Sequence, residues 1–185
     1  MHPDVGRVLI PHERIAQRVG ELARQITADH GAANANGEVT IIPILTGAMI
    51  FCADLIRQMP MAMRIGLCTV SSYPGRSVVS QGPQLLTQQL GDLRGHHVLL
   101  IDDVLDSGNT LRLAAPVLRE MQPATLRLCV LLRKDRPSAR DVKVDYVGFD
   151  IPDAFVVGYG LDFNDKYRNL PDIVTLRDDL IKGPA

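Results

Sequence analysis

Aromatic residues are scarce in this chain, and tryptophan is absent. Four Phe and four Tyr occur among 185 residues, so the 46% of hydrophobic residues must build a largely aliphatic core. The longest apolar run, Ala48 to Ala53, is far shorter than the roughly 20 residues of a membrane span. The first residues also lack the charged and then apolar layout of a signal peptide. We therefore expect a cytoplasmic protein with a single domain over residues 1–185.

An excess of charge of one sign is also lacking. Twenty Lys and Arg residues face 21 Asp and Glu residues, which leaves a formal net charge of −1. Proteins that bind nucleic acid or anionic membranes usually carry a basic excess. The composition therefore gives no electrostatic reason to expect nucleic acid or a membrane as the main partner.

Cysteines are few and far apart. Cys52, Cys68 and Cys129 lie among apolar neighbours, and no CxxC pair exists, so neither a zinc site nor a redox dithiol is indicated. We expect three buried thiols. The adjacent His96 and His97 lack the spacing of metal ligands, and neither GxxxxGK[ST] nor GxGxxG occurs. A P-loop and a dinucleotide-binding turn therefore lack support in the sequence.

Hydrophobic periodicity predicts an α/β protein. Helical spacing of apolar residues and short β-rich runs alternate along the chain, which is typical of a mainly parallel sheet. Between two of the strands, residues 71–83 form a long stretch of Ser, Gly, Pro and Gln that we expect to be a flexible lid. The expected helices cover residues 12–30, 48–59 and 109–121, and the expected strands cover 39–45, 62–70, 84–90, 97–101, 126–132, 144–149, 154–158 and 172–177.

Residues 98–111 carry the most specific pattern in the sequence. Four apolar residues end in two acids, and a loop with a third acid, a hydroxyl and Gly108 then leads into a helix. Glycine lets the backbone approach an anion, and the N–H groups of such a loop and of a helix N-terminus favour a phosphate. Acids beside a phosphate would repel it unless they served sugar hydroxyls, a magnesium shell or a base. The pattern predicts a sugar-phosphate site with Asp102, Asp103 and Asp106.

This segment resembles the motif of type I phosphoribosyltransferases that binds phosphoribosyl pyrophosphate (PRPP): four hydrophobic residues, two acids and then Asp-Thr/Ser-Gly-x-Thr. Residues 144–171 are similar, almost without interruption, to the C-terminal half of hypoxanthine-guanine phosphoribosyltransferases. Residues 44–48 and 71–73 occupy the places of that family's Leu-x-Gly loop and lid. The resemblance implies the type I phosphoribosyltransferase fold, a mainly parallel sheet flanked by helices with a small hood from the N-terminal and C-terminal segments.

The resemblance also implies an activity and a role for each matched residue. The activity is Mg²⁺-dependent transfer of the phosphoribosyl group of PRPP to hypoxanthine or guanine, giving IMP or GMP and pyrophosphate in purine salvage. By similarity, Asp106 is the general base at the purine N7. The implied PRPP-binding residues are Asp102, Asp103, Ser107, Gly108, Asn109, Thr110, Leu45, Thr46, Gly47 and Arg168. The implied purine-site residues are Lys134, Phe155, Val156 and Asp162, the lid residues are Ser72 and Tyr73, and the magnesium ligands are Asp162, Asp102 and Asp103.

Taken alone, several of these residues have plainer interpretations. Phe155 would suit a core position, and Lys134 lies in a charged stretch that would suit a solvated turn. Asp162 and Arg168 would suit a surface ion pair. The acids of residues 102–106 would suit a solvated helix cap.

Two residues depart from the family pattern. Asp102 stands where hypoxanthine-guanine enzymes usually carry Glu, and Thr46 where many carry Lys. Two other functions stay open: a xanthine-preferring transferase, and a PRPP-sensing regulator that binds RNA. The resemblance further implies a homo-oligomer, either a dimer or a tetramer.

Overall fold

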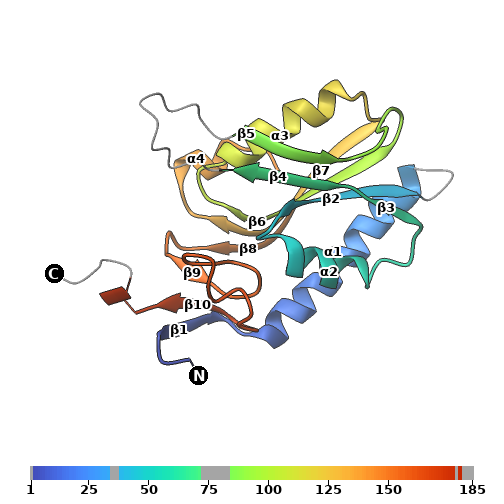
Figure 1. The fold of residues 1–185 in the computed structure, drawn as a ribbon. Coiled ribbons are helices and arrows are strands. Elements are labelled where there is room, and N and C mark those ends of the chain that lie inside the picture. Colours follow the sequence, from blue (N-terminus) through green and yellow to red (C-terminus); the bar gives the residue numbers. More distant parts are fainter. Residues whose placement is uncertain (1, 34–37, 72–83, 178, 181–185) are drawn as a thin grey trace, which may run out of the picture.

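The computed structural model describes residues 2–33, 38–71, 84–177 and 179–180 (Figure 1). Within these residues a seven-stranded sheet has the order β5-β4-β2-β6-β7-β8, and β3 also pairs with β2. The strands β4, β2, β6, β7 and β8 run parallel, and β5 is antiparallel to β4. Their bounds are β2 Val39–Leu45, β3 Met63–Ile65, β4 Leu67–Ser71, β5 Gln84–Gln89, β6 His97–Leu105, β7 Thr125–Lys134 and β8 Tyr146–Ile151.

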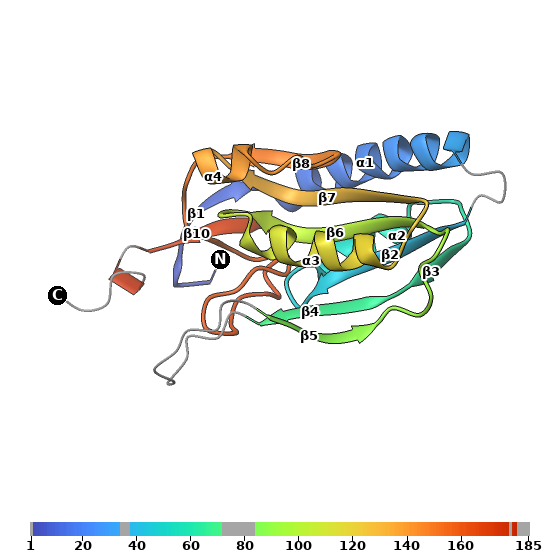
Figure 2. The same ribbon diagram turned by 90° about the horizontal axis from the view of Figure 1, so that it is seen from above.

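Helices cover both faces of this sheet (Figure 2). Helices α1 (His12–Ala33) and α2 (Met49–Ile56) lie on one face, and α3 (Asn109–Glu120) lies on the other. Alternate residues of β6 therefore enter different cores: Leu99 packs with α1 and α2, whereas Leu100 packs with α3. Burial on both faces explains why the central strands have continuous apolar runs instead of alternating ones.

A small antiparallel sheet forms the hood. It has the order β1-β10-β9, with bounds Val5–Ile10, Ile173–Leu176 and Val156–Val157. The segment after β9 packs closely against the turn after β2. The two are so close that a β-carbon on Gly160 would collide with the carbonyl oxygen of Gly47. The hood therefore lies at the carboxyl ends of the parallel strands, where ligands bind in sheets of this kind.

The helices and strands predicted from periodicity are largely confirmed, with three corrections. The single strand expected over 62–70 is wrong, because Gly66 separates β3 from β4 and donates its N–H to the carbonyl of Ile41 at 2.9 Å. The strand expected at 97–101 continues to Leu105, since Val104 and Leu105 still pair with β7. Strand β1 and the short helix α4 (Pro137–Arg140) were not predicted. Beyond Ser71, the expected lid lies outside the described residues.

The cysteines are buried, as predicted. Burial raises the pKa of the Cys52 and Cys68 thiols to about 11, and it raises the pKa of Cys129 further. All three are therefore protonated at neutral pH and act as small apolar residues. Within the part of the chain that the structure describes, no helix combines the length and apolar character needed to cross a membrane.

Candidate active site

The turn of residues 106–108 joins β6 to α3. Gly108 has φ of 79°, and a β-carbon on it would lie 2.5 Å from Cγ2 of Val142. Only glycine suits both that conformation and that space. Arg112 donates from Nη1 to the carbonyl of Ser107 at 2.6 Å and from Nη2 to a carbonyl of α4 at 3.0 Å. The predicted phosphate-binding turn is thus held rigidly, with the first turn of α3, including Asn109 and Thr110, directly behind it.

Asp102 and Asp103 lie within β6 instead of after it. Asp102 is only 5% exposed, and the N–H of Asp103 donates to its Oδ1 at 3.1 Å. Burial, reinforced by the neighbouring carboxylate, raises the pKa of Asp102 well above its ordinary value, and burial raises the pKa of Asp103 as well. Ionising either group therefore costs free energy in the free protein. Hydroxyl donors or a divalent cation brought by a ligand would offset that cost.

The loop after β2 lies directly against Asp103. Leu45 ends the strand, the Leu45–Thr46 peptide is cis, and Thr46 is exposed. A β-carbon on Gly47 would collide with the Asp103 carboxylate, and Gly160 closely approaches the carbonyl oxygen of Gly47. The predicted Leu-x-Gly loop is therefore confined between the acidic pair and the segment after β9.

Four charged residues form what we call the Asp106 cluster: Asp106, Lys134, Arg136 and Asp153. Nζ of Lys134 donates to Oδ2 of Asp106 at 2.8 Å and lies 3.8 Å from Oδ1 of Asp153. Nη1 of Arg136 donates to Oδ1 of Asp106 at 2.5 Å, and its Nε lies 2.6 Å from Oδ2 of Asp153. Two cations and two carboxylates thus form a closed ring at the ends of β6, β7 and β8. Lys134 is 8% exposed, so it is not part of a solvated turn.

Arg168 and Asp162 form the ion pair that the plainer interpretation describes. Nη1 of Arg168 lies 2.9 Å from Oδ1 of Asp162 and donates to the carbonyl of Gly160 at 2.8 Å. The other Asp162 oxygen accepts the N–H of Asp165 at 2.9 Å. The positive charge of Arg168 also acts on Asp103, where it opposes the rise in pKa. Arg168 therefore acts electrostatically on Asp103 and is hydrogen-bonded to Gly160, the residue that approaches the Gly47 loop.

Phe155 is not a core residue. It is 39% exposed and meets Phe163 edge-on, with ring centroids 5.4 Å apart. Its neighbour Val156 is buried in β9 and pairs with Thr175 of β10. Phe155 follows Asp153, a member of the Asp106 cluster, by two residues. Ser72 and Tyr73 lie outside the described residues.

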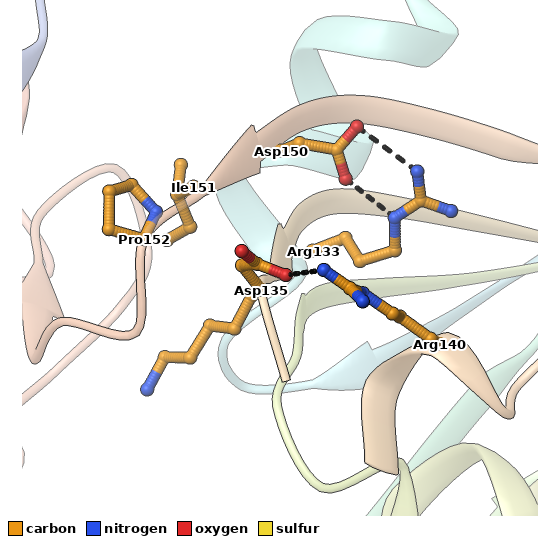
Figure 3. A pocket seen from close by; sticks show the side chains of 7 residues that line it. Arg133, Asp135, Arg140, Asp150, Ile151 and Pro152 are labelled. Carbon is orange, nitrogen blue, oxygen red and sulfur yellow. Dashed lines mark hydrogen bonds and ion pairs between the residues drawn. The ribbon is translucent and has the colours of Figure 1, made fainter. Parts of the chain in front are cut away.

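A depression of about 630 Å³ lies next to the cluster, at the ends of β7 and β8 (Figure 3). Lys134 lines it together with Ile151 and Pro152. The other lining residues are paired with one another: Arg133 donates to Asp150 at 2.6 and 3.0 Å, and Arg140 pairs with Asp135. Both carboxylates of this depression are therefore paired with arginines of the same depression, and Lys134 pairs with Asp106 outside it.

The donor set fits a magnesium ion that arrives with its substrate. Among the described residues, no group of three or more His, Cys, Asp or Glu side chains converges as a metal site. Magnesium usually takes only one or two carboxylates and fills its shell with water and substrate oxygens. The Asp102–Asp103 pair meets that requirement, whereas Asp162 is engaged by Arg168.

Three residues with clear contacts in the site were given no role by the sequence patterns: Arg112, Arg136 and Asp153. Arg136 and Asp153 belong to stretches already singled out, but the contacts of Arg136 with Asp106 and of Asp153 with Lys134 and Arg136 depend on the alignment of three separate strands. Arg112 gave no signal beyond its place on the helix after the turn.

The sequence matches the phosphoribosyl transferase domain family over residues 9–164. It is 39% identical over 176 residues to a hypoxanthine phosphoribosyltransferase of Salmonella typhimurium, covering 93% of this chain and 97% of the relative. It is 43% identical over 178 residues to a hypoxanthine-guanine phosphoribosyltransferase of Mycobacterium avium, covering 94% and 86%. The fold is similar to that of the Trypanosoma cruzi hypoxanthine phosphoribosyltransferase in complex with its product IMP, with a TM-score of 0.85, 33% identity and coverage of 97% and 98%.

Proposed function

The chain belongs to the hypoxanthine-guanine phosphoribosyltransferases, enzymes of purine salvage that make IMP and GMP, and we propose how its residues perform that reaction. The central observation is the distance of 2.8 Å between Nζ of Lys134 and Oδ2 of Asp106. In a 6-oxopurine the oxygen at C6 and N7 lie next to each other on one edge of the base. In the free base with a proton on N7, that edge presents an acceptor beside a donor.

The Asp106–Lys134 pair is the complement of that edge. The lysine ammonium has three donors and no acceptor, so it suits the 6-oxo oxygen and opposes the 6-amino group of adenine. The carboxylate accepts only, so it suits N7–H. When the base enters, each group exchanges its partner in the ion pair for a partner on the purine. Phe155, which is exposed and lies two residues after Asp153 of the cluster, is our candidate for stacking on the ring, with backbone groups of Val156 at the base edge.

PRPP takes the remaining part of the site. The 5′-phosphate binds at the turn of residues 106–108 and the start of α3, and the ribose hydroxyls bind Asp102 and Asp103. The pyrophosphate lies between the Gly47 loop and Arg168, whose guanidinium suits phosphate oxygens. Displacement at the ribose C1′ builds positive charge on the sugar and negative charge on pyrophosphate. Arg168 stabilises the leaving group, and Asp106 accepts the proton that the base sheds from N7.

Magnesium is the proposed cofactor, held by the Asp102–Asp103 pair and by oxygens of PRPP. When bound, it neutralises part of the pyrophosphate charge and helps that group leave. The two carboxyls supply neighbouring oxygen donors, and a bound cation would favour their ionised forms, which burial disfavours in the free protein. Asp162 joins the metal only if it gives up its contact with Arg168.

Three further proposals concern the surroundings of the site. Residues Ser72 and Tyr73 belong to a lid that excludes water from the sugar cation. The enzyme works in the cytoplasm, in line with its buried, unpaired thiols. It assembles as a homo-oligomer, which would cover the exposed apolar side chains of Met49, Ile65 and Leu67.

The test is an assay of pyrophosphate release from PRPP that depends on an added base, with and without magnesium. Hypoxanthine, guanine, xanthine and adenine are compared at equal concentrations. We expect magnesium-dependent release with the first two and little with adenine. Faster turnover of xanthine would favour the xanthine-preferring alternative. Binding of PRPP without turnover of any base would favour the regulatory one.

A further inference from the structure

Arg136 is a second cation on the carboxylate that accepts the proton in the proposed mechanism. It approaches Oδ1 of Asp106, while Lys134 approaches Oδ2. The Nε of the same guanidinium contacts Asp153 at 2.6 Å. A planar guanidinium presents several donors in fixed directions, so one side chain can bridge two carboxylates. A lysine at this position would act as a single point charge and would lose one of the two contacts.

The two cations that contact Asp106 should behave differently when the base binds. Lys134 is buried, with 10% of its side chain exposed, and it turns to the 6-oxo group in the proposed function. Arg136 directly precedes α4, has 41% of its side chain exposed, and is anchored by Asp153. Once the base has drawn Lys134 away, Arg136 is the partner in the cluster that still fixes the plane of the Asp106 carboxylate.

We propose that Arg136 is a positioning residue for catalysis: by bridging Asp106 and Asp153, it orients the proton-accepting carboxylate toward N7 of the bound purine. This inference rests on the proposed role of Asp106. Arg136 itself touches no reacting atom. The effect of losing it should therefore appear in the chemical step, since misplacement of a reacting group lowers turnover more than binding.

The primary variant is Arg136→Met, which keeps the length of the side chain and removes the guanidinium. We expect kcat on hypoxanthine to fall about 10-fold, with KM for PRPP within about twofold of the parent value. Arg136→Lys should recover part of the loss, because it restores the charge but only one contact. Asp153→Asn should lower kcat in the same direction, because it weakens the anchor of the guanidinium.

The matched control is Arg140→Met. Arg140 lies four residues further along, and its side chain also pairs with an aspartate, Asp135. Its backbone N–H donates to the carbonyl of Arg136 at 3.1 Å, a bond that methionine would keep, but among the described residues its side chain forms no hydrogen bond or ion pair with the Asp106 cluster. Its kcat should stay unchanged. Thermal unfolding of Arg136→Met should match that of the control, which separates an effect on catalysis from an effect on the fold.

The deciding measurement places Arg136→Met in the Asp106→Asn background. If Arg136 acts through Asp106, the double variant turns over no more slowly than Asp106→Asn alone. An equal loss in both backgrounds, or an unchanged kcat for Arg136→Met alone, would overturn the proposal while leaving the function of the enzyme intact. Near-normal turnover of Asp106→Asn by itself would instead refute the role of Asp106, and the role of Arg136 with it.

Discussion

The carboxylate of Asp103 fills the space that a β-carbon on Gly47 would need. The loop proposed to bind pyrophosphate and the acids proposed to bind ribose are therefore in direct contact. Each restricts the position of the other, and Gly160 also packs closely against the carbonyl oxygen of Gly47. A substitution in the loop or at Asp103 should therefore affect the binding of both the ribose and the pyrophosphate of PRPP.

Gly47→Ala should impair use of PRPP without unfolding the protein. The added methyl group must displace either the loop or the Asp103 carboxylate, and a shift of about 1 Å in a reacting site can cost on the order of 100-fold in rate. We expect kcat/KM for PRPP to fall by about that factor. Steady-state kinetics with PRPP as the varied substrate checks it.

Gly31→Ala is the control for that substitution. Gly31 lies in α1, and a β-carbon on it would meet nothing within 4 Å. Alanine there should leave kinetics unchanged and raise stability by about 0.5–1 kcal/mol, because glycine is a poor helix former. Parent-like kinetics for Gly47→Ala would show that the loop and Asp103 do not constrain each other.

Asp102→Asn should stabilise the free protein and weaken binding of Mg²⁺ with PRPP. The pKa of Asp102 is raised in the folded state, so its ionised form costs stability at every pH above its ordinary pKa of about 4. Removing the charge should raise Tm at pH 8 by about 3 °C, equivalent to ~1 kcal/mol for a chain of this length. Below pH 4 the gain should vanish, because the carboxyl is then protonated in both states.

Scanning calorimetry at pH 8 and near pH 4, with isothermal titration of PRPP and magnesium, measures both effects. Asp135→Asn, an exposed carboxylate outside the acidic pair, serves as the control and should show neither. A lower Tm for Asp102→Asn at pH 8 would mean that its ionised form is a stabilising group in the free protein.

Lys134→Met should weaken the preference for 6-oxopurines. Methionine fills similar space but donates no hydrogen bond, so the advantage of an oxo group over an amino group at C6 is lost. We expect kcat/KM on hypoxanthine to fall about 100-fold and the ratio of hypoxanthine to adenine rates to fall with it. Initial rates on the four bases provide the test, with the exposed Lys143→Met as the control. An unchanged ratio would remove Lys134 from base recognition.

The burial of His30 predicts that the protein loses stability in mild acid. It is 1% exposed, neither ring nitrogen has a hydrogen-bond partner among the described residues, and burial lowers its pKa to about 4. Its unfolded pKa is about 6.5, so between pH 6.5 and 4 the unfolded chain binds more protons than the folded one. Stability should therefore be fully retained above pH 6.5 and should fall, by on the order of 2 kcal/mol, as the pH drops to 4.

His30→Leu should remove most of that dependence, because leucine suits the same buried site and cannot be protonated. Urea unfolding midpoints of both proteins at pH 7, 6, 5 and 4 make the comparison. If both proteins lose stability equally between pH 6.5 and 4, His30 is not the group responsible.

Much of this fold could be predicted because its signals are local. The helical spacing of apolar residues over 12–30 corresponds to the buried face of α1, which includes Ile15, Val19 and Leu22. The run before Asp102 lies in a strand buried on both faces. The turn at Gly108 was evident from residue types alone. Strand β1 was missed because its exposed and buried positions do not alternate and because its partner, β10, lies at the other end of the chain.

The site was only partly predictable for the same reason. The resemblance named Asp106 and Lys134, which meet at 2.8 Å. It gave no role to Arg136 or Asp153, because their contacts depend on the register of strands far apart in sequence. The ion pair of Asp162 with Arg168 was foreseen only as a competing interpretation, since a sequence does not show which of two partners a carboxylate will choose.

The pairing of β1 with β10 also bears on how the protein is made. Ile10 leaves the ribosome early, yet its partner, Ile173, is synthesised only after the whole parallel sheet. Contacts between such distant residues form late, because the intervening chain must first be ordered. The nascent chain can assemble the sheet that carries the proposed sugar-phosphate turn before the hood is complete, so a truncated translation product would lack the β10 strand with which Val156 pairs.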